Sequence, residues 1–506
     1  MIPGTDEPPY LLFSVAAHVF VEPFTPPLPL LFCLVAAGLA VIASFILVAF
    51  FARNPQAFSD YPRVNLLKWK LTRLLNYPGA SLPIQLTSVL LFALLVSVGF
   101  VGNQNPIYNL APTFVWVIWW VGVAYASAFI GDVWSLINPW KIIFGWAEQL
   151  WRWFRPGKPF SPVLGYPAKL EVWPALVLFL IFAWVENVYG EAIIPSRISQ
   201  MILVYSSITW AGMVLFGKDV WLRHGEAFSL AFGFLARFAP IETRVIQHEP
   251  CGTLGKGAPH PQPSKTSVAS SCSDKGASNQ RELNLRPFAS GLLKIETVSA
   301  SQMLFVLVLL ATVTFDGFAS TLPWINLQAA LKGYLPNVAA ISTLGLVSTI
   351  LIFVALYLCF SVLVGQASGV NLRTLDLGKA FVYTLIPIAL AYHVAHFLLF
   401  LLIQGQLIVP LASDPFGFGW DLFGTAGYRL NFRPIGPNLY WLISVVSIVT
   451  AHIIAVFLAH SIAFRLIPTR RYALRSQYPM LVLMVGYTVA SLWIITQPMY
   501  MSAPSM

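Results

Sequence analysis

The side chains best suited to chemistry are one aspartate and four histidines that lie within apolar segments of the C-terminal half. They are Asp316, His393, His396, His452 and His460. An ionisable side chain within a membrane span is costly, and it marks a functional site by default. At about 100° per residue, His393 and His396 project from one face of a predicted helix, about 60° apart.

These residue types are typical of a metal site. Counted at about 1.5 Å per residue from the ends of their predicted helices, His393, His396 and His452 fall at a similar depth near mid-membrane. Three imidazoles suit a divalent ion such as zinc, iron or copper, and Asp316 would be a fourth ligand or a general base. A haem held by a histidine pair is the alternative cofactor. A histidine that only hydrogen-bonds a neighbouring helix is the structural alternative.

Three further residues are weaker candidates. His460 lies about 12 Å deeper than His452, so it fits a second site or a proton path better than the same metal. Asp132, close to Asn138-Pro139, is typical of a cap on the amphipathic helix that follows. Glu186 is predicted near the outer end of a span, where a solvated or interfacial carboxylate is the simpler interpretation.

The elements that must position these residues are membrane-spanning helices. The chain of 506 residues is 57% hydrophobic and only 10% charged, whereas a soluble domain carries about 25% charged residues. A helix needs roughly 20 apolar residues to cross the hydrocarbon core. Ten segments meet this requirement: 28–51, 82–102, 112–131, 172–189, 195–217, 299–321, 338–365, 378–408, 438–464 and 478–497.

The distribution of basic residues orients these spans. With both termini outside, 26 of the 30 Lys and Arg residues fall in predicted cytoplasmic segments, and loops rich in basic residues stay in the cytoplasm. The excess of ten positive charges therefore indicates a membrane orientation and no nucleic-acid partner. The predicted fold class is all-α: a polytopic integral membrane protein with about ten transmembrane helices.

The segments between the spans suggest two membrane halves. We predict residues 1–249 as an N-terminal half with five spans, 250–297 as a flexible cytoplasmic loop, and 298–506 as a C-terminal half with five spans. Segments 52–80, 134–158 and 219–238 mix Trp, Leu and Phe with basic residues, which is typical of amphipathic helices on the cytoplasmic face. Tryptophans and tyrosines at span ends are predicted to form interfacial belts.

Other motifs are weak or absent. The spacing of His248, Cys251, His260 and Cys272 is irregular and disfavours a zinc site. No Walker A sequence, Rossmann glycine motif or Gly-x-Ser-x-Gly sequence is present, which argues against ATP and dinucleotide chemistry.

Several short motifs occur together along most of the chain. They are residues 131–140, Thr314-Phe315-Asp316-Gly317, Ala391-Tyr392-His393-Val394-Ala395-His396, residues 413–424, Ala451-His452 through Ala459-His460, and Gln477-Tyr478-Pro479-Met480. Together they resemble the membrane-bound fenitrothion hydrolase family, multi-span bacterial proteins described as organophosphate hydrolases. The resemblance implies a bacterial cytoplasmic membrane and a small lipophilic substrate. It assigns no catalytic residues.

The sequence therefore supports two functional hypotheses. The first is a metal-dependent hydrolase of lipophilic phosphoesters, with His393, His396 and His452 holding the ion and Asp316 assisting as ligand or base. The second is a proton- or ion-coupled transporter, or a redox protein that binds haem or metal, using the same residues. Either protein would work within the lipid bilayer, as a homo-oligomer or beside a second membrane subunit.

Overall fold

The computed structural model describes most of the chain and leaves several predicted features outside. The described residues are 30–51, 61–68, 79, 81–158, 160–246, 280–294, 296–369 and 373–497. Most of the predicted amphipathic segment 52–80 and most of the loop 250–287 lie outside this set. The positions of His248, Cys251, His260 and Cys272 lie outside it as well.

Ten helical stretches in the described part are long and apolar enough to cross a membrane, which agrees with the sequence prediction. They are α2 (Leu30–Phe51), α3 (Leu82–Val101), the third span α4 (Leu110–Pro112), η5 (Thr113–Val123) and α5 (Ala124–Phe129), α8 (Trp173–Val188), α9 (Pro195–Phe216), α12 (Ala300–Ala319), α14 (Val338–Ser368), α16 (Ile386–Gln404), α18 (Pro437–Leu466) and α20 (Gln477–Thr496). Short helices join or extend them: α6 (Trp134–Ile137), α7 (Pro139–Phe154), α10 (Lys218–His224), α11 (Ala227–Ala236), α13 (Leu322–Leu331), α15 (Thr374–Phe381), α17 (Ile408–Ser413) and α19 (Arg470–Arg475).

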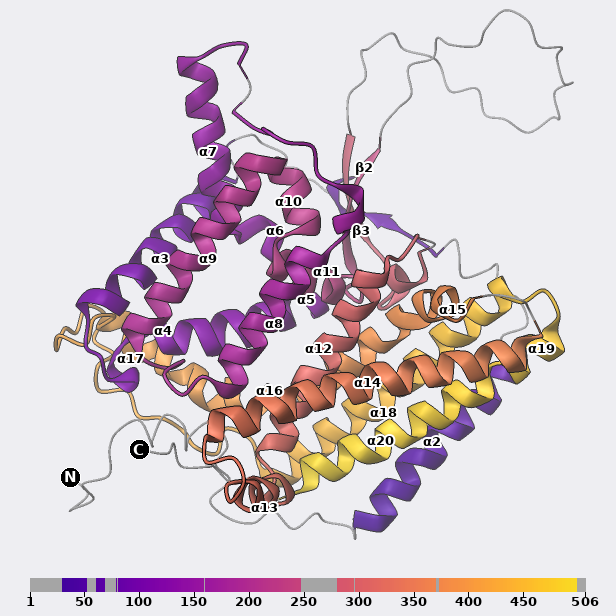
Figure 1. Cartoon of the computed structure of the whole chain (residues 1–506). Coiled ribbons are helices and arrows are strands. Elements are labelled where there is room, and N and C mark those ends of the chain that lie inside the picture. The colour runs from indigo at the N-terminus through magenta and orange to yellow at the C-terminus, as the bar shows by residue number, and fades with distance from the viewer. Residues whose placement is uncertain are drawn as a thin grey trace, which may run out of the picture.

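The spans do not all pack in chain order (Figure 1). The first span, α2, lies against α18 and α20, so it joins helices of the C-terminal half. Helices α3 and α9 pack together on the other side of the molecule. Helix α16 contacts α18, α12 and the third span, which places it between the two groups of helices.

The described part of the chain is mainly helical, as predicted, and its strands form one small antiparallel sheet. The strands are β1 (Val64–Asn65), β2 (Ile241–Ile246) and β3 (Gln280–Leu285), in the order β1-β3-β2. The sheet lies at the same end of the bundle as α10 and α15, and we call this the sheet end (Figure 1). The sequences of β2, IETRVI, and β3, QRELNL, do not alternate apolar and polar residues regularly, so the sequence pattern did not indicate these strands.

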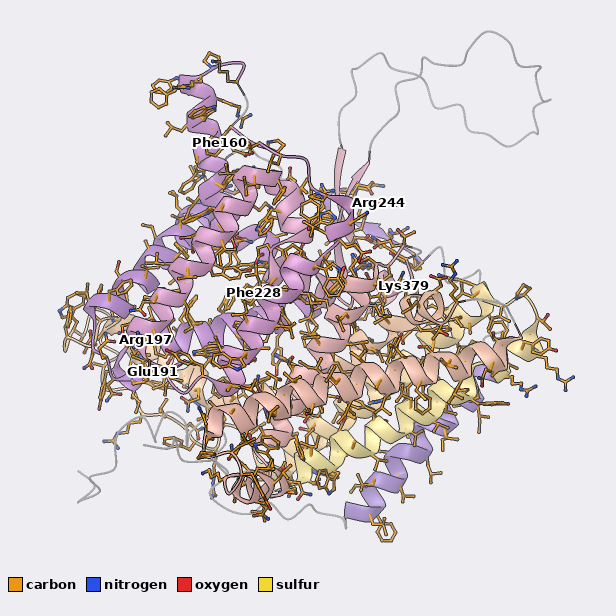
Figure 2. All side chains as sticks on the ribbon, viewed as in Figure 1. Phe160, Glu191, Arg197, Phe228, Arg244 and Lys379 are labelled. Atoms are coloured by element: carbon orange, nitrogen blue, oxygen red, sulfur yellow. The ribbon has the colours of Figure 1, made fainter. Side chains whose placement is uncertain are left out.

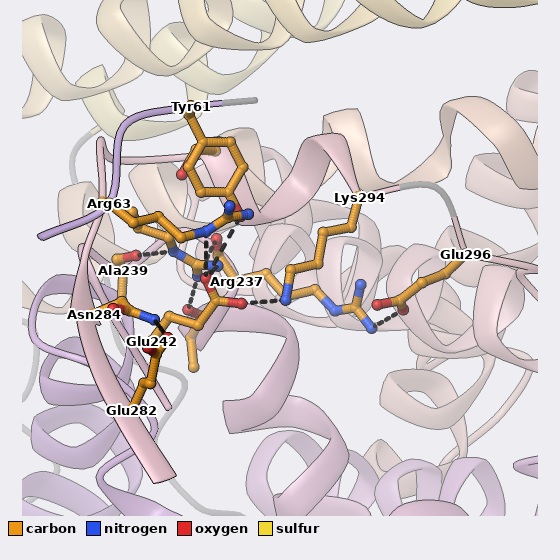
Figure 3. Close-up of polar contacts among 12 residues, drawn as sticks. Tyr61, Arg63, Arg237, Ala239, Glu242, Glu282, Asn284, Lys294 and Glu296 are labelled. Atoms are coloured by element: carbon orange, nitrogen blue, oxygen red, sulfur yellow. Dashed lines mark hydrogen bonds and ion pairs between the residues drawn. The ribbon is translucent and has the colours of Figure 1, made fainter. Parts of the chain in front are cut away.

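A buried carboxylate ties the sheet to its neighbours (Figure 3). Glu242 on β2 pairs with Lys294, with Arg286 at 3.2 Å and with Arg63 at 3.8 Å. Burial opposes ionisation of Glu242, but the hydrogen bond from Lys294 and the three positive charges outweigh it, so the pKa lies below its ordinary value. The cluster joins three parts of the chain. Arg63 precedes the second span, Glu242 follows the fifth, and Arg286 and Lys294 precede the sixth.

The predicted amphipathic helices have different outcomes. Helix α7 carries its apolar side chains on one face, and Trp153 and Phe154 at its end are exposed. Segment 219–238 is not one surface helix: it divides into α10 and α11, and most side chains of α11 are buried among the spans. Eight of the ten α11 residues are buried, because its sequence AFSLAFGFLA has no charged face.

Aromatic rings fill the core around α11, which the prediction of interfacial belts did not anticipate. Trp119 lies 4.5 Å from Phe228 between ring centroids, and Trp120 lies 4.6 Å from Phe182. Figure 2 shows Phe228 among the helices of the N-terminal half. Trp119 and Trp120 both belong to η5, a π-helical stretch that follows Pro112. Such wide turns occur often at functional sites.

Candidate functional site

The centre of the candidate site is a contact between Asp316 on α12 and His396 on α16. The imidazole Nε2 and the carboxylate Oδ2 are 2.7 Å apart, a distance typical of a charge-assisted hydrogen bond. The imidazole side chain is 1% exposed and the carboxylate 22%. The sequence singled out both residues, and the structure brings them together from segments that are 80 residues apart.

Close packing of α12 on α16 holds this pair in position. Helix α12 continues past Gly317 to Ala319, so the glycine does not end it. A Cβ atom at position 317 would lie 2.2 Å from the hydroxyl of Tyr392, which shows how closely that side chain approaches the α12 backbone. Thr314, one turn earlier, is 2.7 Å from the Tyr487 hydroxyl on α20.

Two tyrosines fix the central turn of α16 from opposite sides. Tyr125 on α5 donates to the carbonyl of His393 at 3.1 Å, and Tyr440 on α18 donates to the carbonyl of Ala395 at 2.6 Å. Because these bonds involve the backbone, they set the height and rotation of the helix that carries both histidines. Sequence reasoning treated such tyrosines as interfacial and missed this role.

A second carboxylate reaches the site from the N-terminal half. Glu186 on α8 accepts a hydrogen bond of 2.5 Å from the indole N–H of Trp120. Its carboxylate also interacts electrostatically with that of Asp316. Glu186 therefore faces the interior, in contrast to the sequence interpretation of a solvated or interfacial side chain.

His393 points toward the N-terminal half. Its ring centroid lies 5.4 Å from that of Tyr125 and 6.1 Å from that of Trp120. Neither ring nitrogen makes a hydrogen bond within the described part of the chain. The ring borders a small cavity whose other lining side chains are Trp120, Ala124, Ala231, Phe232, Leu235, Leu309, Val313 and Ala389.

The remaining two histidines make contacts elsewhere. His452 on α18 donates from Nδ1 to its own helix, at the carbonyl of Ile448, and its ring packs near Tyr487. His460 donates from Nδ1 to the side-chain oxygen of Gln477 at 3.0 Å. His460 thus links α18 to the start of α20. A histidine that only hydrogen-bonds a neighbouring helix was the structural alternative to a metal ligand.

The predicted metal ligands have different principal neighbours in this arrangement. Among the described residues, no group of three or more His, Cys, Asp or Glu side chains is arranged to hold a metal ion. His393 faces Trp120, His396 contacts Asp316 and His452 faces Tyr487. The metal site and the haem alternative remain predictions, and no chemical step below depends on either.

Asp132 lies just before the short helix α6. Its carboxylate accepts from the backbone N–H of Ser135 at 3.1 Å, in the first turn of α6, whose N-cap position is Val133. The amphipathic helix α7 is capped by Asn138, which accepts from the backbone N–H of Lys141 at 3.1 Å.

Sequence reasoning also missed a fully buried acid, Glu226. Its carboxylate accepts from the backbone N–H groups of Phe228 and Ser229 at the start of α11, and from the Tyr205 hydroxyl at 2.5 Å. The Ser229 hydroxyl also donates to it at 2.5 Å. These four donors make Glu226 a helix cap that joins α11 to α9. The signal was present in the sequence as a glutamate directly before an uncharged apolar run.

Comparisons with known proteins identify no relative. No family model, curated protein or solved structure matches this chain. The conclusions below therefore rest on the residues and their geometry.

Proposed function

We propose that this protein is a membrane-embedded hydrolase of small lipophilic esters, phosphoesters among them, with the Asp316–His396 pair as its acid–base group. The observation that carries the proposal is the 2.7 Å contact between Nε2 of His396 and Oδ2 of Asp316 inside the helix bundle. A carboxylate bonded to one nitrogen of an imidazole fixes its orientation and stabilises the imidazolium form. The resemblance to fenitrothion hydrolases favours phosphoesters among the esters.

The proposed reaction uses water as the nucleophile. Nδ1 of His396, the nitrogen that Asp316 does not engage, takes a proton from water as the water oxygen bonds to the phosphorus or carbonyl carbon. The bond from that atom to the ester oxygen then breaks, and the imidazolium returns the proton to the leaving oxygen. The carboxylate of Asp316 stays ionised throughout and stabilises the transient positive charge.

The bundle setting supports a lipophilic substrate. His396 lies in a helix whose neighbouring turns are buried on nearly all sides, so a water-soluble ester would have to leave its hydration shell. A substrate that partitions into lipid has already lost much of that shell. We propose the bacterial cytoplasmic membrane as the location, with the sheet end in the cytoplasm and both termini outside, because the basic residues are concentrated at that end.

The test is hydrolysis of a lipophilic aryl phosphotriester and an aryl carboxylate ester by purified protein in proteoliposomes. Asp316→Asn and His396→Asn should each lower kcat by about 10²–10⁴-fold, the usual range for a general base. His460→Gln is the matched control, because it also removes a buried histidine yet should leave kcat unchanged. Wild-type protein without turnover of either ester, or full activity in Asp316→Asn, would contradict the proposal.

Proton-coupled transport is the second candidate, and one observation favours it. Glu186 and Asp316 are interacting carboxylates contributed by α8 and α12, one from each half of the chain. Two such groups inside a bundle can pass a proton between them as the halves move. Acidification of proteoliposomes that Glu186→Gln abolishes, without ester turnover, would favour this function over hydrolysis.

A further inference from the structure

The last turns of α7 project from the bundle, whereas its first turns are packed within it. The Trp140 indole donates to the hydroxyl of Ser206 on α9 at 2.7 Å, which fixes the start of the helix against a span. The side chains of residues 149–154 are exposed, except for that of Trp151, which is partly covered. Figure 1 shows this end of α7 standing away from its neighbours α3 and α9.

These exposed turns carry one apolar face. Leu150, Trp153 and Phe154 are 57%, 76% and 64% exposed. Residues three and four positions apart lie on the same side of a helix, so the three side chains form one patch. We call it the α7 patch. A group of large apolar side chains that stays so exposed marks an interaction surface.

Positive charge borders the α7 patch. Arg152, Arg155 and Lys158 are all exposed, and no acidic residue lies between positions 149 and 158. The nearest acid along the chain is Glu148, which is already paired with Lys218 at 2.5 Å. The end of α7 therefore presents three uncompensated positive charges of the local sequence next to an apolar face.

The pair between Glu148 and Lys218 also gives the depth of the patch. Lys218 begins α10 directly after the span α9, so the pair marks the limit of that span at the sheet end. Phe154 is six residues beyond Glu148, at most about 9 Å further at about 1.5 Å per residue. The polar layer on each side of the hydrocarbon core is roughly 5 to 7.5 Å thick. The patch therefore lies at the depth of the lipid headgroups.

We propose that the end of α7 binds anionic phospholipids in the leaflet at the sheet end. The α7 patch inserts among the upper acyl chains, and the basic side chains contact the lipid phosphates. Aromatic residues on one face and basic residues beside them are typical of helices that lie in this interface. Each basic residue near an anionic bilayer surface strengthens the contact about fivefold. A second copy of the chain would bring like charges together, which disfavours self-association through this patch.

The test measures the depth of a nitroxide label on the full chain in nanodiscs that hold one protein each. Leu150→Cys carries the label in a background whose four natural cysteines are replaced by alanine. Thr243→Cys, on the exposed strand β2, is the matched control at the same end. In phosphatidylcholine discs with roughly a third phosphatidylglycerol, a neutral nickel chelate should reach position 150 at least about threefold less than position 243. In discs of phosphatidylcholine alone, this protection should be weaker.

Charge variants test the anionic part of the proposal. Arg152→Gln, Arg155→Gln and Lys158→Gln together should remove the difference between the two lipid mixtures. Arg470→Gln with Arg471→Gln, at two exposed positions on α19, is the control and should preserve it. Equal access of the chelate to positions 150 and 243 in the anionic discs would overturn the proposal, and so would equal protection in both mixtures. Protection in detergent that grows with protein concentration would identify a second copy as the occupant and would also overturn it.

Discussion

The close approach of α12 and α16 leads to a quantitative prediction about Gly317. An alanine Cβ at this position would lie 2.2 Å from the Tyr392 hydroxyl, whereas ordinary van der Waals contact begins at 3.4 Å. The two helices must therefore separate by roughly 1 Å, or Tyr392 must leave its place, and such overpacking costs about 1–3 kcal/mol. The same displacement should lengthen the bond between Asp316 and His396.

A second substitution should rescue the first. In Tyr392→Phe the hydroxyl is gone, and the nearest ring atom to the new Cβ is then 3.2 Å away, a distance that small shifts can relieve. The Tyr392 hydroxyl has no hydrogen-bond partner among the described residues, so its removal alone should cost less than about 1 kcal/mol. The double mutant should therefore be more stable than Gly317→Ala, with a coupling of at least about 1 kcal/mol.

The assay is the free energy of unfolding in mixed detergent micelles, measured for the single and double mutants. Gly486→Ala is the matched control: it lies within α20, and nothing stands within 4 Å of its new Cβ. That substitution should be neutral or stabilising by up to about 1 kcal/mol, as expected for alanine in place of glycine in a helix. Wild-type stability of Gly317→Ala, or a double mutant no more stable than it, would refute the packing argument.

Four other predictions follow from the described contacts and the charge pattern. Because the pKa of Glu242 is below the ordinary value of 4.5, its ionised form stabilises the fold above pH 4.5, and this contribution disappears as the pH falls through the lower value. Glu242→Gln should therefore lower stability at neutral pH and flatten its acid dependence, as measured by unfolding between about pH 3 and about pH 7. Glu226→Ala should cost more than about 2 kcal/mol, and Glu226→Gln less, because alanine removes a helix cap and leaves the Tyr205 hydroxyl without its acceptor. Elemental analysis should find about one divalent ion per chain if the predicted metal site forms, with loss in His393→Ala and His452→Ala, whereas a Soret absorption band would favour haem. An enzyme reporter that is active only outside the cytoplasm should be active when fused after the last residue, and an inactive but folded fusion would reverse the proposed orientation.

The spans could be predicted from the sequence because hydrophobic length and charge placement are local properties. A run of about 20 apolar residues must cross the hydrocarbon core as a helix, since no other backbone conformation of a single segment satisfies its own hydrogen bonds there. Asp316 and His396 could be singled out for the same reason, because an ionisable side chain in such a run stands out.

The grouping of those side chains depended on tertiary structure. Helical rise gave His393, His396 and His452 a similar depth, but which way each ring faces depends on the rotation of its helix and on the helices beside it. Tyr125 and Tyr440 fix the rotation of α16, and His396 then faces Asp316. His393 consequently faces the N-terminal half.

Glu186 shows the same distinction most clearly. From the sequence alone it was a carboxylate near the end of a span, and its predicted depth favoured contact with water. Packing of α8 against α12 and donation from Trp120 turn it toward Asp316 instead. The length of the apolar runs determined that these helices lie in the membrane. Side-chain packing between distant segments decided which ionisable groups meet. The reason is that the composition of a span constrains its depth in the membrane and not its rotation about its own axis.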